Sequence, residues 1–277
     1  MLTRIITAIV ALVAFIPILI YSNTWAFPIA VAFLSLVGVI EMLRCIDEKK
    51  LSVRAVSMIL AVLSPVYARF AGSTSEFLSP FCAAVFFYLV FLLALSVFSH
   101  GKLDVSHTAM TFTMVFYIIS AFTSLVLIRD TVHGHILYLL AFLGPWISDS
   151  AAYFCGRAFG RHKLIPDVSP KKTVEGALGG VVFCGIAFSL YGFIISRFFI
   201  TSVKPSYLIL FVIGVCVSAI SQIGDLIASL IKRKYSIKDY GKLFPGHGGV
   251  MDRFDSVLIT APLLLIVAEL SEFISLF

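Results

Sequence analysis

The sequence predicts an all-α, polytopic membrane protein, a single integral membrane domain over residues 1–277. Of its 277 residues, 60% are hydrophobic and only 13% are charged, whereas soluble globular proteins are about a quarter charged. The mean hydropathy is +1.04. Apolar runs near the ~20 residues that a helix needs to cross a bilayer recur along the whole chain and leave no room for a soluble domain.

These apolar runs predict about nine spans. The first run is longer than the 7 to 15 residues usual for a signal peptide, so we interpret it as a helix. The third is the least secure, because Pro65 and Arg69 interrupt a run of only ~15 residues, and eight spans are the alternative. The predicted spans cover residues 2–21, 25–43, 56–70, 77–98, 108–127, 136–154, 174–198, 207–231 and 251–273.

The orientation follows from lysine and arginine, which are retained on the cytoplasmic side during insertion. With nine spans, the N-terminus and the even-numbered loops carry all of the 21 basic residues except Arg69, Arg129, Arg197 and Lys204. We therefore expect a cytoplasmic N-terminus, with the polar loops facing the cytoplasm from a bacterial-type inner membrane. The net charge of +6 describes local clusters in these loops and excludes a nucleic-acid-binding face.

Five cysteines lie in or beside apolar spans without CxxC spacing, which argues against a disulfide frame or a cysteine metal site. The first 140 residues contain little that indicates a function. There, Glu41 and Arg44 lie three apart and could pair across one helical turn. We expect the catalytic helices and loops in residues 145–277.

The first polar segment covers residues 148–176. Asp149 lies within an apolar span, where an ionised side chain costs about 3 kcal/mol at the bilayer centre, so a partner should compensate it. Arg157, Lys171 and Lys172 lie in a glycine-containing loop that can offer cations and backbone N–H groups to polyphosphate. A purely topological role is the alternative, because the P-loop pattern GxxxxGK[ST] is absent.

The second polar segment places one polar stripe along the eighth predicted span. Its residues recur every three or four positions, and in a membrane helix such a stripe must face protein or water. We therefore expect it to line a cavity. The stripe comprises Ser218, Ser221 or Gln222, Asp225, Ser229 and Lys232.

A loop of acids, bases and glycines follows this span. If the flanking helices are antiparallel neighbours, Asp225, Asp252 and Asp255 converge there. Carboxylates beside phosphate-binding cations predict Mg²⁺, which takes oxygen ligands and shares them with substrate phosphates. The alternative is an ion-pair lock, in which Asp225 pairs with Lys232, and Asp252 or Asp255 pairs with Arg253 or Arg233.

Residues 229–255 resemble the phosphatidate cytidylyltransferase family, the CDP-diacylglycerol synthases. They contain S-x-x-K-R, K-D-x-G, P-x-H-G-G and D-R-x-D, and residues 148–176 are similar to a second block of that family. The resemblance implies a nucleotidyltransferase of phospholipid biosynthesis that converts CTP and phosphatidate in the bilayer into CDP-diacylglycerol and pyrophosphate. It also implies Mg²⁺, a homodimer, and a second, monovalent cation such as K⁺.

By motif position, the resemblance implies that Asp225 and Asp252 are the metal ligands, with Asp255 as their partner or as a ligand of a second metal. We expect Asp225, Asp252, Lys232 and Ser229 to be catalytic. The expected substrate-binding residues are Arg233, Lys238, Asp239, His247, Gly248, Gly249, Arg253, Asp149, Arg157, Lys171 and Lys172.

Two other functions fit the composition. A CTP-dependent lipid kinase would transfer the terminal phosphoryl group of CTP to a lipid alcohol. A transporter would use the aspartates for ion coupling, but coupled transport predicts inverted repeats, and none is apparent in the sequence.

Overall fold

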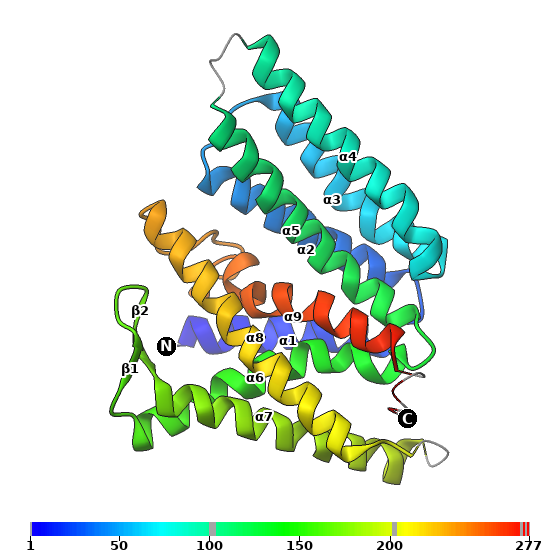
Figure 1. Ribbon diagram of the computed structural model, residues 1–277, viewed down its shortest axis with the longest axis vertical. Helices are drawn as coiled ribbons and strands as arrows, with labels where there is room; N and C mark the ends of the chain where they lie inside the picture. Colours follow the sequence, from blue (N-terminus) through cyan, green and yellow to red (C-terminus); the bar gives the residue numbers. More distant parts are fainter. Residues whose placement is uncertain (1, 100–103, 201–203, 272–273, 275, 277) are drawn as a thin grey trace. The chain divides into compact units, whose positions relative to one another are not determined.

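The computed structural model describes residues 2–99, 104–200, 204–271, 274 and 276, and their regular secondary structure is helical apart from one short hairpin (Figure 1). Two predictions concern residues outside the described ranges. They are the place of Lys102 among the basic residues of the even-numbered loops and the end of the last span at residue 273. The helices are α1 (Leu2–Ile20), α2 (Ala26–Cys45), α3 (Leu51–Ala71), α4 (Thr74–Phe98), α5 (Val105–Asp130), α6 (Gly134–Phe159), α7 (Val174–Ile194) with a π-helical turn over Ile195–Phe199, α8 (Tyr207–Lys234) and α9 (Met251–Glu269). The hairpin strands are β1 (Lys163–Ile165) and β2 (Ser169–Thr173).

The helices confirm a polytopic membrane protein. Over the described residues, seven helical segments are long and apolar enough to cross a bilayer. They are α2, α3, α4, α5, α6, α7 with its π-helical turn, and α8. The first and last helices are not among the seven, so the total of about nine spans and the cytoplasmic N-terminus stay predictions.

The third predicted span is longer than expected. The α3 helix has 21 residues and is one of the seven apolar candidates, with Pro65 buried inside it. Arg69 does not end the helix because its charge is compensated. Its guanidinium is 2.8 Å from the Asp130 carboxylate at the end of α5 and donates to the Ser22 carbonyl at 2.8 Å. The predicted span of ~15 residues, 56–70, was too short mainly at its beginning, because α3 starts at Leu51.

The chain divides into two compact units. The first comprises Met1–Asp130 and Tyr235–Phe254, and the second comprises Thr131–Lys234 and Asp255–Phe277. The loop after α8 thus belongs to the first unit with α1–α5, and the α9 helix begins in the first unit and continues in the second.

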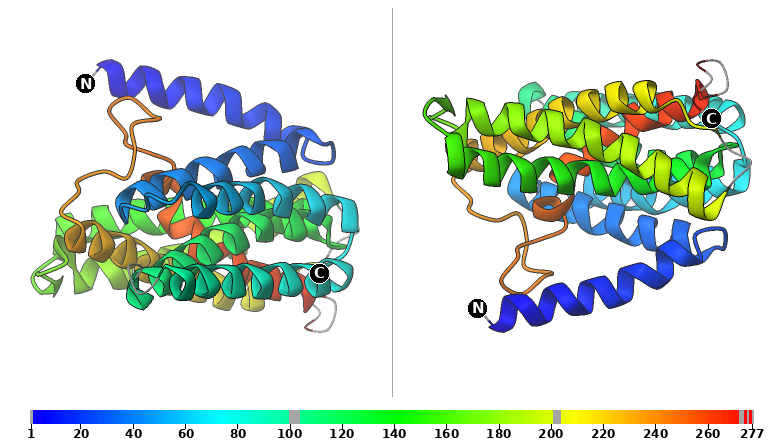
Figure 2. Two further views of the ribbon diagram at one scale, coloured as in Figure 1. Left: turned by 90° about the horizontal axis from the view of Figure 1, so that it is seen from above. Right: turned by 90° about the horizontal axis from the view of Figure 1, so that it is seen from below.

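In the first unit, α2, α3 and α5 pack against one another, and α4 covers α3 and α5. Phe27, Met42 and Phe122 are almost completely buried among them. Figure 2 shows α1 diverging from α2 beyond the turn that joins them. This packing gives α2, the helix that carries Glu41, a fixed place beside α3 and α5.

In the second unit, α7 packs against both α6 and α8, and α6 and α8 also contact each other (Figure 1). Glycine permits the close approach of these helices, as is common in membrane bundles. A Cβ added to Gly144 of α6 would lie 2.7 Å from the Val217 side chain of α8, and one added to Gly214 would lie 2.7 Å from the Cys184 carbonyl of α7.

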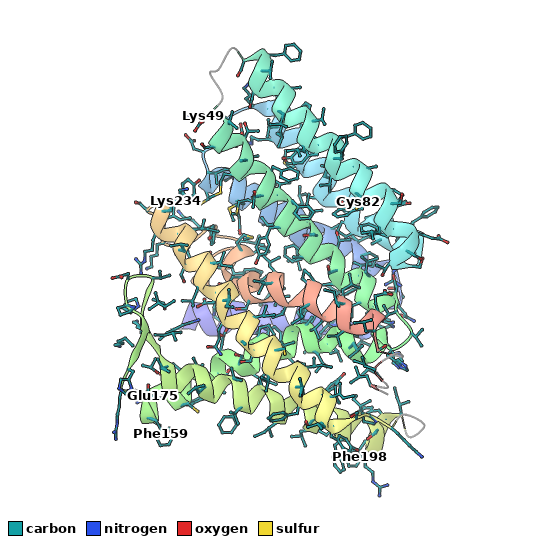
Figure 3. All side chains as sticks on the ribbon, viewed as in Figure 1. Lys49, Cys82, Phe159, Glu175, Phe198 and Lys234 are labelled. Atoms are coloured by element: carbon teal, nitrogen blue, oxygen red, sulfur yellow. The ribbon has the colours of Figure 1, made fainter. Side chains whose placement is uncertain are left out.

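The hairpin between α6 and α7 is tied to the start of α7. Its strands are antiparallel, with Lys163 opposite Thr173. Glu175, labelled in Figure 3, accepts hydrogen bonds from the Arg161 amide at 3.0 Å and the His162 amide at 3.3 Å, and it contacts the His162 ring at 2.6 Å. Glu175 thereby fixes the direction in which the hairpin leaves the helices.

Candidate active site

The N-terminal half of the predicted polar stripe on α8 makes helix contacts. Ser218 is fully buried and hydrogen-bonds the Ser148 hydroxyl of α6 at 2.6 Å. The Gln222 side-chain amide donates to the Ala177 carbonyl of α7 at 3.1 Å. The expectation that the whole stripe lines a cavity was therefore wrong for this half. Hydrogen bonds between membrane helices satisfy such groups and contribute about 0.6 kcal/mol each.

The C-terminal half of the stripe carries charge. The Asp225 carboxylate lies 2.6 Å from the Lys172 ammonium, which comes from the end of β2, and both side chains are partly exposed. Asp149 of α6 and Asp255 of α9 both interact electrostatically with Asp225. We call Asp149, Asp225 and Asp255 the carboxylate cluster.

Lys172 supplies part of the compensation that Asp149 was expected to need, but burial and the nearby Asp225 carboxylate act against it. The same lysine forms an ion pair with Asp225, for which the lock alternative had named Lys232. Lys232 interacts electrostatically with Asp255. The sequence could not identify Lys172 as the partner, because the hairpin delivers it from a distant part of the chain.

The carboxylate cluster offers oxygen atoms of the kind that Mg²⁺ takes as ligands. It gathers three acidic groups, whose like charges repel one another, and Lys172 lies within ion-pair distance of Asp225. Hard carboxylate oxygens are the ligands that Mg²⁺ prefers. Within the described ranges, however, no three His, Cys, Asp or Glu side chains are grouped closely enough to hold a metal ion. The donors fit Mg²⁺ in kind, and the cluster alone does not enclose one.

Asp252 lies in the first unit, where the backbone holds its side chain. One carboxylate oxygen accepts hydrogen bonds from the Tyr240 amide at 2.8 Å and the Gly249 amide at 2.9 Å. Gly248 has a φ of 89°, and a Cβ at this position would lie 2.7 Å from the same oxygen. The glycine is needed both for the turn and for the close approach of the carboxylate. We call residues 240–252 the Asp252 loop.

His247 and Arg253 stabilise the same loop. The Arg253 guanidinium donates to the His247 carbonyl at 2.8 Å, and the His247 amide donates to the Phe244 carbonyl at 2.8 Å. In the part of the chain that the structure describes, the buried Nδ1 of His247 has no hydrogen-bond partner. The P-x-H-G-G and D-R-x-D motifs therefore build one turn around Asp252.

The other predicted site residues lie on accessible surfaces. Ser229 and Lys232 of α8 are half-buried. Asp225 belongs to the second unit and Asp252 to the first, so their convergence on one ion stays a prediction. The exposed predicted residues are Arg157, Lys171, Arg233, Lys238, Asp239 and Arg253.

Sequence reasoning missed one polar residue at this loop, Glu41 of α2. The sequence suggested that Glu41 pairs with Arg44. In the structure, its carboxylate accepts hydrogen bonds from the backbone amides at the start of α9. The available signal was a lone acid near the end of an apolar helix, since such a charge needs a partner.

The fold and these residues define a polytopic helical membrane protein whose carboxylates and cations suit a phosphate substrate. The chain belongs to the cytidylyltransferase family, whose model matches residues 2–271. This family membership confirms the resemblance seen in the motifs and identifies the chain as a nucleotidyltransferase.

Relatives match the chain over nearly its whole length. It is 35% identical over 268 residues to the phosphatidate cytidylyltransferase of Staphylococcus haemolyticus, covering 96% of this chain and 98% of the relative. The enzyme of the same name from Staphylococcus saprophyticus is 34% identical, and that from Staphylococcus aureus is 32% identical, with the same coverage.

Proposed function

We propose that the protein transfers the cytidylyl group of CTP to phosphatidate, giving CDP-diacylglycerol and pyrophosphate for phospholipid biosynthesis. The observation that carries this proposal is the end-to-end match to phosphatidate cytidylyltransferases. The carboxylate cluster and the Asp252 loop support it, because they gather acids and cations of the kind that polyphosphate chemistry uses.

In the proposed reaction, a phosphate oxygen of phosphatidate attacks the α-phosphorus of CTP. A new P–O bond forms, and the bond from the α-phosphorus to the oxygen that bridges it to the β-phosphorus breaks. Pyrophosphate leaves with that oxygen. Phosphatidate is already largely dianionic at neutral pH, since its second pKa is near ~6, so no general base is required. The barrier comes from bringing two anions together, and cations with alignment would lower it.

Asp225 and Asp252 would hold Mg²⁺, with Asp255 as a further carboxylate beside them. When bound, Mg²⁺ would neutralise charge on the CTP phosphates. A second, monovalent cation such as K⁺ is part of the proposal. The donors proposed for Mg²⁺ are carboxylate oxygens, which suit a hard cation.

The basic residues would hold the phosphates. Lys172 and Lys232 lie among the carboxylates and would contact the transferred group. Ser229 would offer a hydroxyl on the same face of α8, and Gly248 and Gly249 would let backbone approach a phosphate. The exposed cations that would attract CTP and the lipid phosphate are Arg157, Lys171, Arg233, Lys238 and Arg253, with Asp239 and His247 beside them.

We further propose that the site faces the cytoplasm from the inner membrane and that the protein is a homodimer. CTP is cytoplasmic and the basic loops would remain on that side. Phosphatidate would reach the site from within the bilayer.

Lys172 gives a prediction specific to this proposal. Replacing Lys172 with glutamine should lower kcat/KM for CTP by about 10- to 100-fold, because a charge-assisted contact contributes about 1.5–3 kcal/mol. A steady-state assay in detergent measures this. Lys163→Gln is the matched control, since Lys163 lies exposed on β1 of the same hairpin. Equal activities of the two variants would contradict a role for Lys172.

The product of the reaction tests the proposed function. Purified protein is given phosphatidate and CTP labelled in either the cytidine or the γ-phosphate. We expect the cytidine label in lipid and the γ-label in pyrophosphate. The γ-label in lipid would instead show a CTP-dependent lipid kinase, and no labelled product would reject both reactions.

A further inference from the structure

Glu41 is a buried acid in the last two turns of α2. Only 3% of its surface is exposed. A carboxylate at such a position is costly unless hydrogen bonds replace its water. The sequence suggests Arg44 as the partner, but the structure places Glu41 against the polypeptide backbone of a distant segment.

The two Glu41 oxygens bind the start of α9. One accepts the Val250 amide at 3.1 Å, and the other accepts the Met251 amide at 2.9 Å. The first amides of a helix have no acceptor within the helix and carry partial positive charge. Glu41 therefore caps α9 from another helix. Both partner residues are almost completely buried, so water cannot take over these bonds.

The Glu41 carboxylate also shapes the loop before α9. A Cβ added to Gly241 or Gly249 would overlap the Glu41 carboxylate. These are the last glycines of the K-D-x-G and P-x-H-G-G motifs. The loop thus reaches its observed path only because glycine at both positions admits Glu41.

Asp252 binds the same loop through a different pair of backbone amides. It accepts the amides of Tyr240 and Gly249, while Glu41 accepts those of Val250 and Met251. Three consecutive amides, from Gly249 to Met251, are therefore divided between the two carboxylates. A shift of the Val250–Met251 backbone would move Asp252, which is the next residue in the chain.

We propose that Glu41 is a positioning residue that fixes the Asp252 loop and thereby the direction of the Asp252 carboxylate. The inference rests on the proposed function in one respect, since the placement of Asp252 affects turnover only if Asp252 serves the transfer site. The effect on the backbone is independent of that function.

The test compares Glu41→Gln with wild type by hydrogen exchange of the backbone amides and by CDP-diacylglycerol synthesis. Glutamine has nearly the same size, but its NH₂ group cannot accept one of the two amides. We expect faster exchange confined to residues 249–252. We also expect turnover to fall by about 10- to 100-fold, as is usual when a partner of a metal ligand is lost. The Mg²⁺ concentration for half-maximal turnover should rise.

Glu48→Gln is the matched control. Glu48 is also a buried acid of the first unit, 8% exposed, and it accepts the Lys50 amide and contacts His107 away from the Asp252 loop. Glu48→Gln should leave hydrogen exchange at residues 249–252 and the Mg²⁺ dependence of turnover unchanged. Glu41→Asp, which keeps the charge on a shorter side chain, provides the exchange measurement if the glutamine variant does not fold.

The outcomes are separable. Wild-type exchange at residues 249–252 in both Glu41 variants would overturn the proposal, as would faster exchange without any loss of turnover in an active enzyme. An equal loss in Glu48→Gln would mean that Glu41 has only a general structural role. If wild type makes no CDP-diacylglycerol while Glu41→Gln still loosens residues 249–252, the proposed function fails and the backbone role of Glu41 stands.

Discussion

Replacing Asp225 with asparagine should reduce CDP-diacylglycerol synthesis by at least about 1000-fold while the protein remains folded. The carboxylate would contribute several kilocalories per mole of charge stabilisation through Mg²⁺, and asparagine keeps the shape without the charge. The loss should appear in kcat and should not be restored by raising Mg²⁺. A product assay in detergent, with size-exclusion chromatography as the folding check, measures this effect.

The structure offers Asp167→Asn as a matched control. Asp167 lies exposed in the same unit, in the turn between β1 and β2. It should retain activity close to wild type. Activity of Asp225→Asn within tenfold of this control at any Mg²⁺ concentration would reject Asp225 as a metal ligand.

Replacing Asp252 with asparagine should cause a loss of similar size and a second effect that Asp225→Asn lacks. Asp252 accepts two backbone amides, so the substitution also weakens the hold on the loop. We expect faster hydrogen exchange at residues 240 and 249 together with at least about 1000-fold lower turnover. Asp225→Asn should leave exchange at these amides unchanged.

Asp104→Asn serves as the control for the loss of such an acceptor. Asp104 belongs to the same unit and accepts the Ser106 amide at 3.2 Å, outside any predicted site. In this variant, the Ser106 amide should exchange faster with solvent while CDP-diacylglycerol synthesis stays normal. Loosening of the Asp252 loop without loss of activity would show that Asp252 is structural only.

The helices could be predicted well from the sequence because each apolar run is physically required in a bilayer. All nine predicted segments correspond to helices in the described part of the chain. The main misjudgement concerned α3, which begins at Leu51 instead of the predicted residue 56 and which is not interrupted at Arg69. Arg69 stays helical because Asp130 and Ser22 lie beside it. Such partners come from other helices, and one sequence does not identify them.

The site was less predictable than the fold. The spacing of Asp225 along α8 and the D-R-x-D motif at the start of α9 pointed to these carboxylates directly. Lys172 was named as a phosphate ligand, but its contact with Asp225 depends on the hairpin. Glu41 was assigned to Arg44 because helical spacing reveals neighbours on the same helix only, while its partners are backbone amides of a distant loop.

The proposed cytidylyl transfer is tested most directly by the stoichiometry of its products in a Mg²⁺ titration of purified wild-type protein with CTP and phosphatidate. We expect CDP-diacylglycerol and pyrophosphate in equal amounts, with no turnover after chelation and recovery when Mg²⁺ is restored. CDP-diacylglycerol formed at an undiminished rate in the chelated sample, or lipid product without matching pyrophosphate, would contradict it.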